Sequence, residues 1–459
     1  MTNIKDLRGQ SRRRFLRWTA AAGAALALDR SQVLNVISDS AGSALADEAS
    51  CSTTMRSVHL VAGDGGFAWF QLLWPHNEVA TSTNNNFAFH AQGQQLKADD
   101  TDKTLYHVPQ TPWVQRDKTK RISAFMAGTN QTHTPTPGSA ATVGAGQSML
   151  AVCSSIQRAN PTLIPAIGIT PLAFGSAPGV PQLTTVGNAD GMVQLFNSAA
   201  SRSILEVESD AQLFESYYKT FLGLNAAATR PTVQRPLNIG KKSANFLGKN
   251  LAALLEPTAD DLTRYDVVDS TPNKLRELAK TLITTAKAFK LGLTSCVVLP
   301  VMRDDPHGAF ADMGMLLATV NHLGLILDEF MNDLATTPDP TCSGKTLADN
   351  VVITVHGDTP KTPLDRSGWP DGTPGNSNWL YVMGNGYTKT GWFGGVKADG
   401  SVLGFDPTTG AEVPGQGANV TSAAAGAAVA FAVAKGDRRR VEDFYSGPWI
   451  AGTVNQNPV

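Results

Sequence analysis

Acidic and imidazole side chains directly follow two apolar runs of strand length. His356 and Asp358 come after the run from Asp349 to Val355, and Asp64 lies in a glycine-rich turn after the run from Ser57 to Val61. The carboxyl ends of parallel strands meet at one edge of a sheet, so residues far apart in the chain can form one site there. Imidazole and carboxylate groups bind divalent metal ions, and either can act as a general base.

Two further polar groups hold the same position relative to predicted strands. Asp305 and His307 follow an apolar run from Leu293 to Val301, and a hydroxyl-rich loop containing Thr132 and His133 follows the run 120–126. Each residue alone also fits a turn or a helix entry, so the prediction depends on their convergence at one sheet edge. The predicted metal ligands are Asp64, Asp305, His307, His356 and Asp358, and the predicted catalytic residues are Thr132 and His133. Carboxylates and imidazoles together suit Zn²⁺, Mn²⁺, Mg²⁺ or Ca²⁺.

The elements that must position these groups alternate between strands and helices. Strands are predicted at 57–61, 120–126, 162–169, 293–301, 349–355 and 379–384, and helices at 139–158, 271–291, 311–334 and 421–435, with a broken helical region at 190–255. Ser139 is the expected N-cap of the first helix. Such alternation with long connections predicts an α/β fold, a mostly parallel sheet with helices on both faces.

The N-terminus has the features of an export signal. Arg12, Arg13 and Arg14 precede Phe15, and the apolar run that follows, Trp18 to Leu28, is too short to be a permanent membrane anchor. Small residues at 44–46 predict cleavage there, with 25–27 as an earlier alternative. We therefore expect residues 1–46 to be a twin-arginine signal peptide read by the Tat translocase. Residues 47–459 are then a single large α/β domain with loop insertions, periplasmic or secreted.

Composition limits the classes of molecule that this protein is expected to bind. Residues 1–46 hold seven Lys or Arg and three Asp or Glu, so the 38 basic and 39 acidic residues of the chain fall to 31 and 36 without them. A mildly acidic chain without a basic patch interleaved with aromatic residues disfavours nucleic acid. After the signal region, no run is long and apolar enough for a transmembrane helix. The four cysteines, Cys51, Cys153, Cys296 and Cys342, allow two disulfides in an oxidising compartment, although Cys153 and Cys296 also fit buried thiols.

Several common catalytic motifs are missing. Gly344-Lys345-Thr346 resembles the end of a phosphate-binding loop, but Asp339 stands where that motif requires glycine. The sequence contains neither a Gly-x-Ser-x-Gly elbow nor a His-Glu-x-x-His pair. No dinucleotide-binding fingerprint follows the first predicted strand.

These features together resemble a family of Tat-exported bacterial proteins known as domain of unknown function 1501, within the alkaline phosphatase-like (sulfatase-like) superfamily. The resemblance is carried by the twin-arginine leader, the Gly63-Asp64-Gly65 turn, Asp305-Pro306-His307 before a long helix, and the strand 351–355 with its glycine-rich sequel at 383–395. It covers most of the chain after residue 46. It implies an alkaline phosphatase-like fold and a metal-dependent hydrolase of phosphate or sulfate esters.

The chain departs from that family at two motifs. His356-Gly357-Asp358 stands where the family usually has a Ser-Glu-Phe-Gly-Arg-like motif, and residues 372–377 lack the Asp-His pair usual in the next loop. His356 and Asp358 are the expected replacements if catalysis is retained. The alternative is a catalytically degenerate protein of the same fold that serves as a scaffold or binds a small molecule or a surface polymer.

Overall fold

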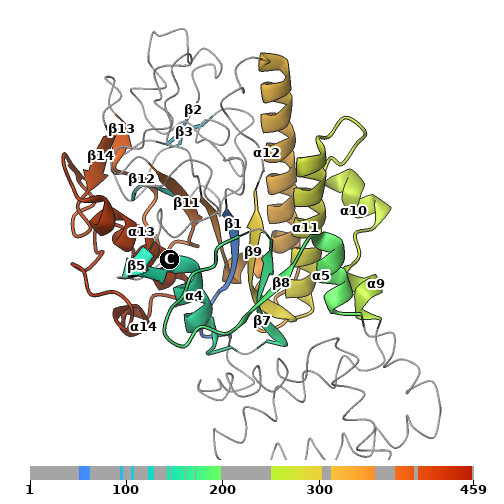
Figure 1. Cartoon of the computed structure of the whole chain (residues 1–459), viewed down its shortest axis with the longest axis horizontal. Coiled ribbons are helices and arrows are strands. Elements are labelled where there is room, and N and C mark those ends of the chain that lie inside the picture. The colour runs from blue at the N-terminus through green and yellow to red at the C-terminus, as the bar shows by residue number, and fades with distance from the viewer. Residues whose placement is uncertain are drawn as a thin grey trace, which may run out of the picture.

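A computed structural model gives the architecture of the chain (Figure 1). It describes residues 51–61, 94–96, 105–107, 122–128, 142–144, 146–160, 162–170, 172–197, 250–301, 312–356, 378–396 and 402–456. The export signal predicted at 1–46 lies outside these ranges. Among the described helices, none has the length and apolar character needed to cross a membrane.

An eight-stranded sheet forms the centre of the molecule. Its strands, in spatial order, are β12 (Gly391–Phe393), β4 (Ile122–Met126), β11 (Trp379–Met383), β10 (Val351–His356), β1 (Arg56–Val61), β9 (Thr294–Pro300), β7 (Ile164–Ile169) and β8 (Leu183–Val186). Only β11 among these eight runs antiparallel to its neighbours. The predicted α/β class, a mostly parallel sheet with helices, is thereby confirmed.

Register brings several strand ends to one level. Val61 at the end of β1 lies opposite His356 of β10 and Pro300 of β9. His356 in turn lies opposite Leu380 of β11, which pairs with Phe125 near the end of β4. We call this side of the sheet the carboxyl edge and the opposite side, where β1 and β10 begin, the amino edge. Strand spacing of about 4.8 Å puts the ends of β10 and β9 roughly 10 Å apart.

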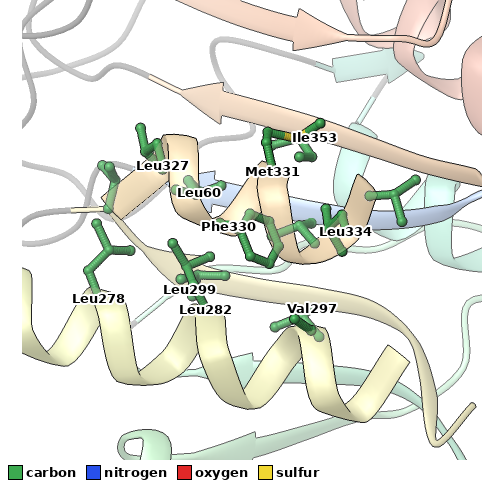
Figure 2. Packing of buried hydrophobic residues seen from close by; sticks show 14 of the residues in the cluster. Leu60, Leu278, Leu282, Val297, Leu299, Leu327, Phe330, Met331, Leu334 and Ile353 are labelled. Atoms are coloured by element: carbon green, nitrogen blue, oxygen red, sulfur yellow. The ribbon is translucent and has the colours of Figure 1, made fainter. Parts of the chain in front are cut away.

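The two longest described helices cover one face of the sheet (Figures 1 and 2). They are α11 (Asn273–Lys290) and α12 (Met313–Thr336), joined on this side by α5 (Ala189–Leu195), α9 (Leu251–Leu255) and α10 (Ala259–Arg264). Leu278 and Leu282 of α11 and Phe330 of α12 pack against Leu60 of β1 and Leu299 of β9. Apolar residues recur every three or four positions on both helices, which is the spacing that buries one stripe of a helix.

The other face of the sheet is covered by α4 (Met149–Gln157) and α13 (Ala418–Val433). The middle of α13 is rich in alanine, so the helix approaches its neighbours closely. Gly426 lies against the backbone of Thr142, and any Cβ there would collide with the Thr142 carbonyl oxygen. This second face also contains the apolar residues Val61, Val352 and Val298, which alternate along the strands with those of the first face.

A disulfide and a buried ion pair link the start of β1 to the segment before β10 at the amino edge. A disulfide joins Cys51, just before β1, to Cys342, in the connection that leads to β10. Beside it the buried Arg56 guanidinium donates both of its terminal amino groups to the Asp339 carboxylate, each at 3.1 Å. Asp339 also accepts from Asn350 Nδ2 at 2.7 Å, so this buried charge pair keeps its hydrogen bonds inside the protein.

The structure corrects one predicted helix. The helix predicted at 139–158 begins later, because Thr142–Gly144 (β5) and Gln147–Ser148 (β6) form a hairpin and Ser148 caps α4. Gly146 turns this hairpin with a φ of 73°, which a helix cannot accommodate.

The cysteines follow one of the two predicted alternatives. Cys51 and Cys342 form a disulfide, and Cys153 and Cys296 are free, buried thiols.

Breaking the Cys51–Cys342 bond should destabilise the fold without changing it. The bond links residues 291 positions apart, so its loss frees a long loop in the unfolded chain and should lower the free energy of unfolding by about 2–5 kcal/mol. Urea unfolding of the Cys51→Ser/Cys342→Ser variant measures this. Dithiothreitol should lower the stability of the wild type to that of the variant and leave the variant unchanged. An equal effect of the reductant on both proteins would contradict the assignment.

Candidate functional site

His356 is the predicted site residue that the structure describes. It is the last residue of β10, and its side chain is 1 % exposed. The other predicted site residues lie outside the described ranges: Asp64, Asp305, His307, Asp358, Thr132 and His133. No three histidine, cysteine, aspartate or glutamate side chains gather as metal ligands would within the described part of the chain.

The other predicted residues follow, in the sequence, strands whose ends the structure describes. Asp64 is three positions beyond the end of β1 and Asp358 two beyond the end of β10, and these ends are neighbours in register. Asp305 follows β9, on the other side of β1, and Thr132 follows β4, which ends at the same carboxyl edge. The sequence reasoning therefore named residues that follow four strands ending at one edge.

The His356 imidazole is the end of a chain of buried hydrogen bonds. Its Nε2 lies 2.8 Å from Thr354 Oγ1, and the same oxygen lies 2.7 Å from His59 Nδ1 on the neighbouring strand β1. His59 Nε2 then lies 2.9 Å from Ser57 Oγ. All four side chains point to the face covered by α4 and α13, because parallel register places paired residues on the same side. We call these four residues the buried polar chain.

Gln157 of α4 anchors the far end of the buried polar chain. Its Nε2 donates to Ser57 Oγ at 3.0 Å and lies within 3.1 Å of the carbonyl oxygens of Met55 and Ser295. Two carbonyl acceptors fix the orientation of the amide, since only its nitrogen can donate to them. Ser57 also hydrogen-bonds the Cys296 thiol, and burial raises the pKa of Cys296 to about 12, so this sulfur carries its proton.

At the near end, one ring atom of His356 lacks a partner. Nδ1 is fully buried and makes no hydrogen bond within the described structure, whereas Nε2 is held by Thr354. Buried polar atoms are usually paired. Several other buried side-chain atoms of the described residues also lack a partner, and His356 Nδ1 is the histidine nitrogen among them, at the carboxyl edge. An imidazole that hydrogen-bonds through one nitrogen and presents the other is the usual state of a metal-binding histidine.

Burial keeps both imidazoles neutral. It lowers the pKa of His59 to about 3, and burial together with the nearby His59 lowers the pKa of His356 well below its usual value. The ring centres are 6.2 Å apart and the rings are nearly perpendicular, so two charged imidazoles would repel at short range. A neutral imidazole has the free lone pair that a metal ion requires.

Two helices direct their N-termini toward this edge. The C-terminal residue of α4, Gln157, donates a hydrogen bond to the Met55 carbonyl at the amino edge, so the N-terminus of α4 points to the carboxyl edge. Thr421 in the first turn of α13 accepts from the Gly128 backbone after β4, whereas Val433 at its C-terminus accepts from the Met55 N–H at the amino edge. Neither helix has an acidic residue in its first turn. The partial positive charge of a helix N-terminus favours anions, so the carboxyl edge on this face is electrostatically suited to an anionic group.

A separate cleft of about 270 Å³ opens on the opposite face of the sheet, also at the carboxyl edge. Its apolar part includes Ile169, Leu278 and Val301, and Lys274 and Glu277 of α11 are among its polar lining. An apolar cavity with a few polar groups is the usual form of a small-molecule site. No motif in the sequence predicts this cleft, because its lining comes from the ends of β7, β9 and α11, which are far apart in the chain.

His59 and Thr354 were also missed as site residues, since each lies inside an apolar strand. The available signal is a period of two: Ser57 and His59 in β1, and Thr354 and His356 in β10, are polar residues at alternate positions. Alternation places each pair on one face of its strand. That these two faces adjoin follows only from the pairing of strands 295 residues apart.

No protein-family model, curated protein or solved structure matches the chain.

Stability should fall as the pH drops through the histidine range. Both imidazoles have a lowered pKa in the folded protein, so the unfolded state binds more protons below about pH 6.5, and the stability present above that pH is progressively lost. The loss from His59 should continue toward pH 3, with a slope of about 1.4 kcal/mol per pH unit for each histidine. Urea unfolding of metal-free protein between pH 7 and pH 5 measures it.

Two variants make that measurement specific. His59→Gln should reduce the slope by the contribution of one proton. Ser57→Ala should lower the stability at every pH and keep the wild-type slope, because it breaks the hydrogen bond between Ser57 and His59 and removes no titrating group. An unchanged slope in His59→Gln would show that His59 does not titrate on unfolding.

Proposed function

We propose that this protein is an exported, metal-dependent hydrolase of phosphate or sulfate esters with an alkaline phosphatase-like arrangement of its sheet. The observation that carries the proposal is the buried, unpartnered Nδ1 of His356 at the carboxyl edge. The neighbouring strand ends lead directly to Asp64, Asp358 and Asp305, which supply carboxylate oxygens. An orphaned imidazole nitrogen next to such segments fits a divalent metal site.

In this proposal His356, Asp64, Asp305, His307 and Asp358 would hold the metal, and the unpartnered Nδ1 of His356 would be the available nitrogen. A bound divalent ion supplies Lewis acidity, which polarises an ester oxygen and lowers the pKa of a nearby hydroxyl. The Thr132 hydroxyl is the proposed nucleophile, with His133 beside it as the second catalytic residue.

The proposed reaction has two steps, formation of a threonine ester and its hydrolysis. The Thr132 oxygen forms a bond to phosphorus or sulfur as the bond to the leaving alcohol breaks, and the threonine proton is transferred so that the alcohol leaves neutral. Water then attacks the esterified threonine, which releases phosphate or sulfate and restores the hydroxyl. The N-termini of α4 and α13 favour the anionic ester and product electrostatically.

Export is the second part of the proposal. The twin-arginine sequence at the N-terminus supports passage through the Tat translocase to the periplasm or the exterior. The Cys51–Cys342 disulfide supports the same destination, because structural disulfides persist mainly in oxidising compartments.

Metal content and ester hydrolysis test this function together. The mature protein, exported through its own signal, should contain divalent metal by plasma mass spectrometry and hydrolyse para-nitrophenyl phosphate or sulfate. His356→Gln should weaken metal binding at least tenfold and lower kcat/KM in proportion. His322→Gln is the matched control, because His322 lies on α12 over the opposite face of the sheet. Wild-type protein that, as isolated after export through its own signal, contains no divalent metal and hydrolyses neither ester would reject the proposal.

The cleft beside α11 supports a second candidate function, that of a binding protein for a small apolar molecule with an anionic group. The apolar residues Ile169, Leu278 and Val301 would contact the hydrocarbon part, and Lys274 would attract the anion. A cavity of 150 Å³ already accommodates benzene, so about 270 Å³ suits one or two rings.

Binding of anilinonaphthalene sulfonate measured by calorimetry tests this second function. We expect one molecule to bind per chain and Gly187→Leu to weaken binding at least tenfold. Gly187 lines the cleft and a Cβ there meets no atom within 4 Å, so a larger side chain fills the cleft without a collision. Leu254→Ala, at an exposed apolar position on α9, should leave binding unchanged. Equal binding by wild type and Gly187→Leu would exclude the cleft as the site.

A further inference from the structure

We propose that the buried polar chain fixes the tautomer of His356, with the Nε2 atom protonated and the Nδ1 lone pair free, and that His59 is a positioning residue acting through Thr354. This inference rests on the proposed metal site, because it explains how His356 is prepared as a ligand. It assigns a role to His59, Thr354 and Ser57, none of which contacts the proposed metal.

The Thr354 hydroxyl couples the two imidazoles. It has one hydrogen and lies within hydrogen-bond distance of His59 Nδ1, at 2.7 Å, and of His356 Nε2, at 2.8 Å. Because it can donate to only one of them, it must accept from the other. The proton positions of His59 and His356 are therefore linked, although the two rings do not hydrogen-bond each other.

Two complete proton arrangements satisfy the chain. In the first, Ser57 donates to the Cys296 sulfur, His59 donates through Nε2 to Ser57, Thr354 donates to His59 Nδ1, and His356 donates through Nε2 to Thr354. In the second, every one of these hydrogen bonds between Ser57 and His356 is reversed, so that His356 accepts at Nε2 and carries its proton on Nδ1.

The far end of the chain accepts either arrangement. Ser57 Oγ receives a hydrogen bond from Gln157 in both cases, and its own proton goes to Cys296 in the first and to His59 in the second. Gln157 Oε1 has no hydrogen-bond partner in the described structure in either case, so it does not distinguish the two arrangements. The difference in free energy between the two arrangements therefore arises at the other end of the buried polar chain, at His356 Nδ1.

At that end the first arrangement is the favoured one. The second places an N–H on the buried Nδ1, where no acceptor lies within the described structure, and an unsatisfied buried donor costs about 1–3 kcal/mol. The first leaves Nδ1 unprotonated, which is the form of the imidazole that would bind a cation. Metal binding and the first arrangement thus stabilise each other, and the chain presents His356 as a prepared ligand.

The tautomer can be measured directly in metal-free protein. Long-range ¹H–¹⁵N correlation spectra of protein labelled at its histidine nitrogens distinguish a protonated ring nitrogen from an unprotonated one. Wild-type His356 should show protonated Nε2 and unprotonated Nδ1. Thr354→Val keeps the shape of the side chain and removes the coupling hydroxyl, so His356 should become a mixture of tautomers. Thr354→Ser keeps the hydroxyl and should restore the wild-type spectrum.

Zn²⁺ titration gives the second readout. Loss of the partner that orients a ligand histidine typically weakens metal affinity 10–100-fold, so Thr354→Val should raise the Zn²⁺ dissociation constant by that factor. Thr354→Ser should remain close to wild type. The matched control is Thr388→Val, the same substitution at a fully buried threonine whose hydroxyl has no hydrogen-bond partner in the described structure. This control should change neither the spectrum nor the affinity.

The two readouts separate this inference from the function on which it rests. Wild-type protein that binds no Zn²⁺ yet shows the Nε2-protonated tautomer would reject the metal site and support the role of the chain. Protonated Nδ1 in the wild type, or a tautomer unaffected by Thr354→Val, would overturn the inference even if the protein binds metal.

Discussion

The pairing of β1 between β9 and β10 is the constraint on which the rest of the structure depends. Register along β1 sets Val61 opposite both His356 and Pro300, and it sets His59 opposite Thr354. The first of these alignments brings the strand ends together at the carboxyl edge. The second builds the buried polar chain. A shift of one residue would send Ser57 and His59 to the face of α11 and α12, where the core around Leu60 and Leu299 has no partner for them.

The interactions that stabilise the fold and the predicted site lie at opposite edges of the sheet. At the amino edge the disulfide, the Arg56–Asp339 pair and its hydrogen bonds fasten the start of β1 to the segment before β10. Arg56 and Asp339 have a structural role, because both charges are buried and each is paired with the other. The carboxyl edge has the unpartnered His356 and the strand ends that lead to the predicted ligands. Rigid attachment at one edge holds the opposite ends of the same strands in place, which is what a preorganised site requires.

The sequence was sufficient for the elements that periodicity and composition define. Apolar β-branched runs gave β1, β9 and β10 to within a residue or two, and helical spacing gave α11, α12 and α13. The local pattern is misleading in two places. Small residues at helical spacing extend through the β5–β6 hairpin, where Gly146 makes the turn, and β8 at the sheet edge, with Thr184 and Thr185, has no apolar run to mark it. The site was partly predictable, because His356 follows a strand. Its partners were not, since the contact of Thr354 with His59 exists only after distant strands pair.

During synthesis of this chain, the central strand β1 is made long before its two neighbours, β9 and β10. His59 meets Thr354 across 295 residues, and β9 and β10, the two neighbours of β1, are both made in the second half of the chain. Until then an apolar strand with two open edges has no partner of its own, a state that invites association with other chains. Folding dominated by such distant contacts is slow. In a nascent chain β1 therefore stays without both of its neighbours until residues 294–300 and 351–356 have been made, and a fragment ending before residue 351 lacks β10, the strand that joins β1 to β11.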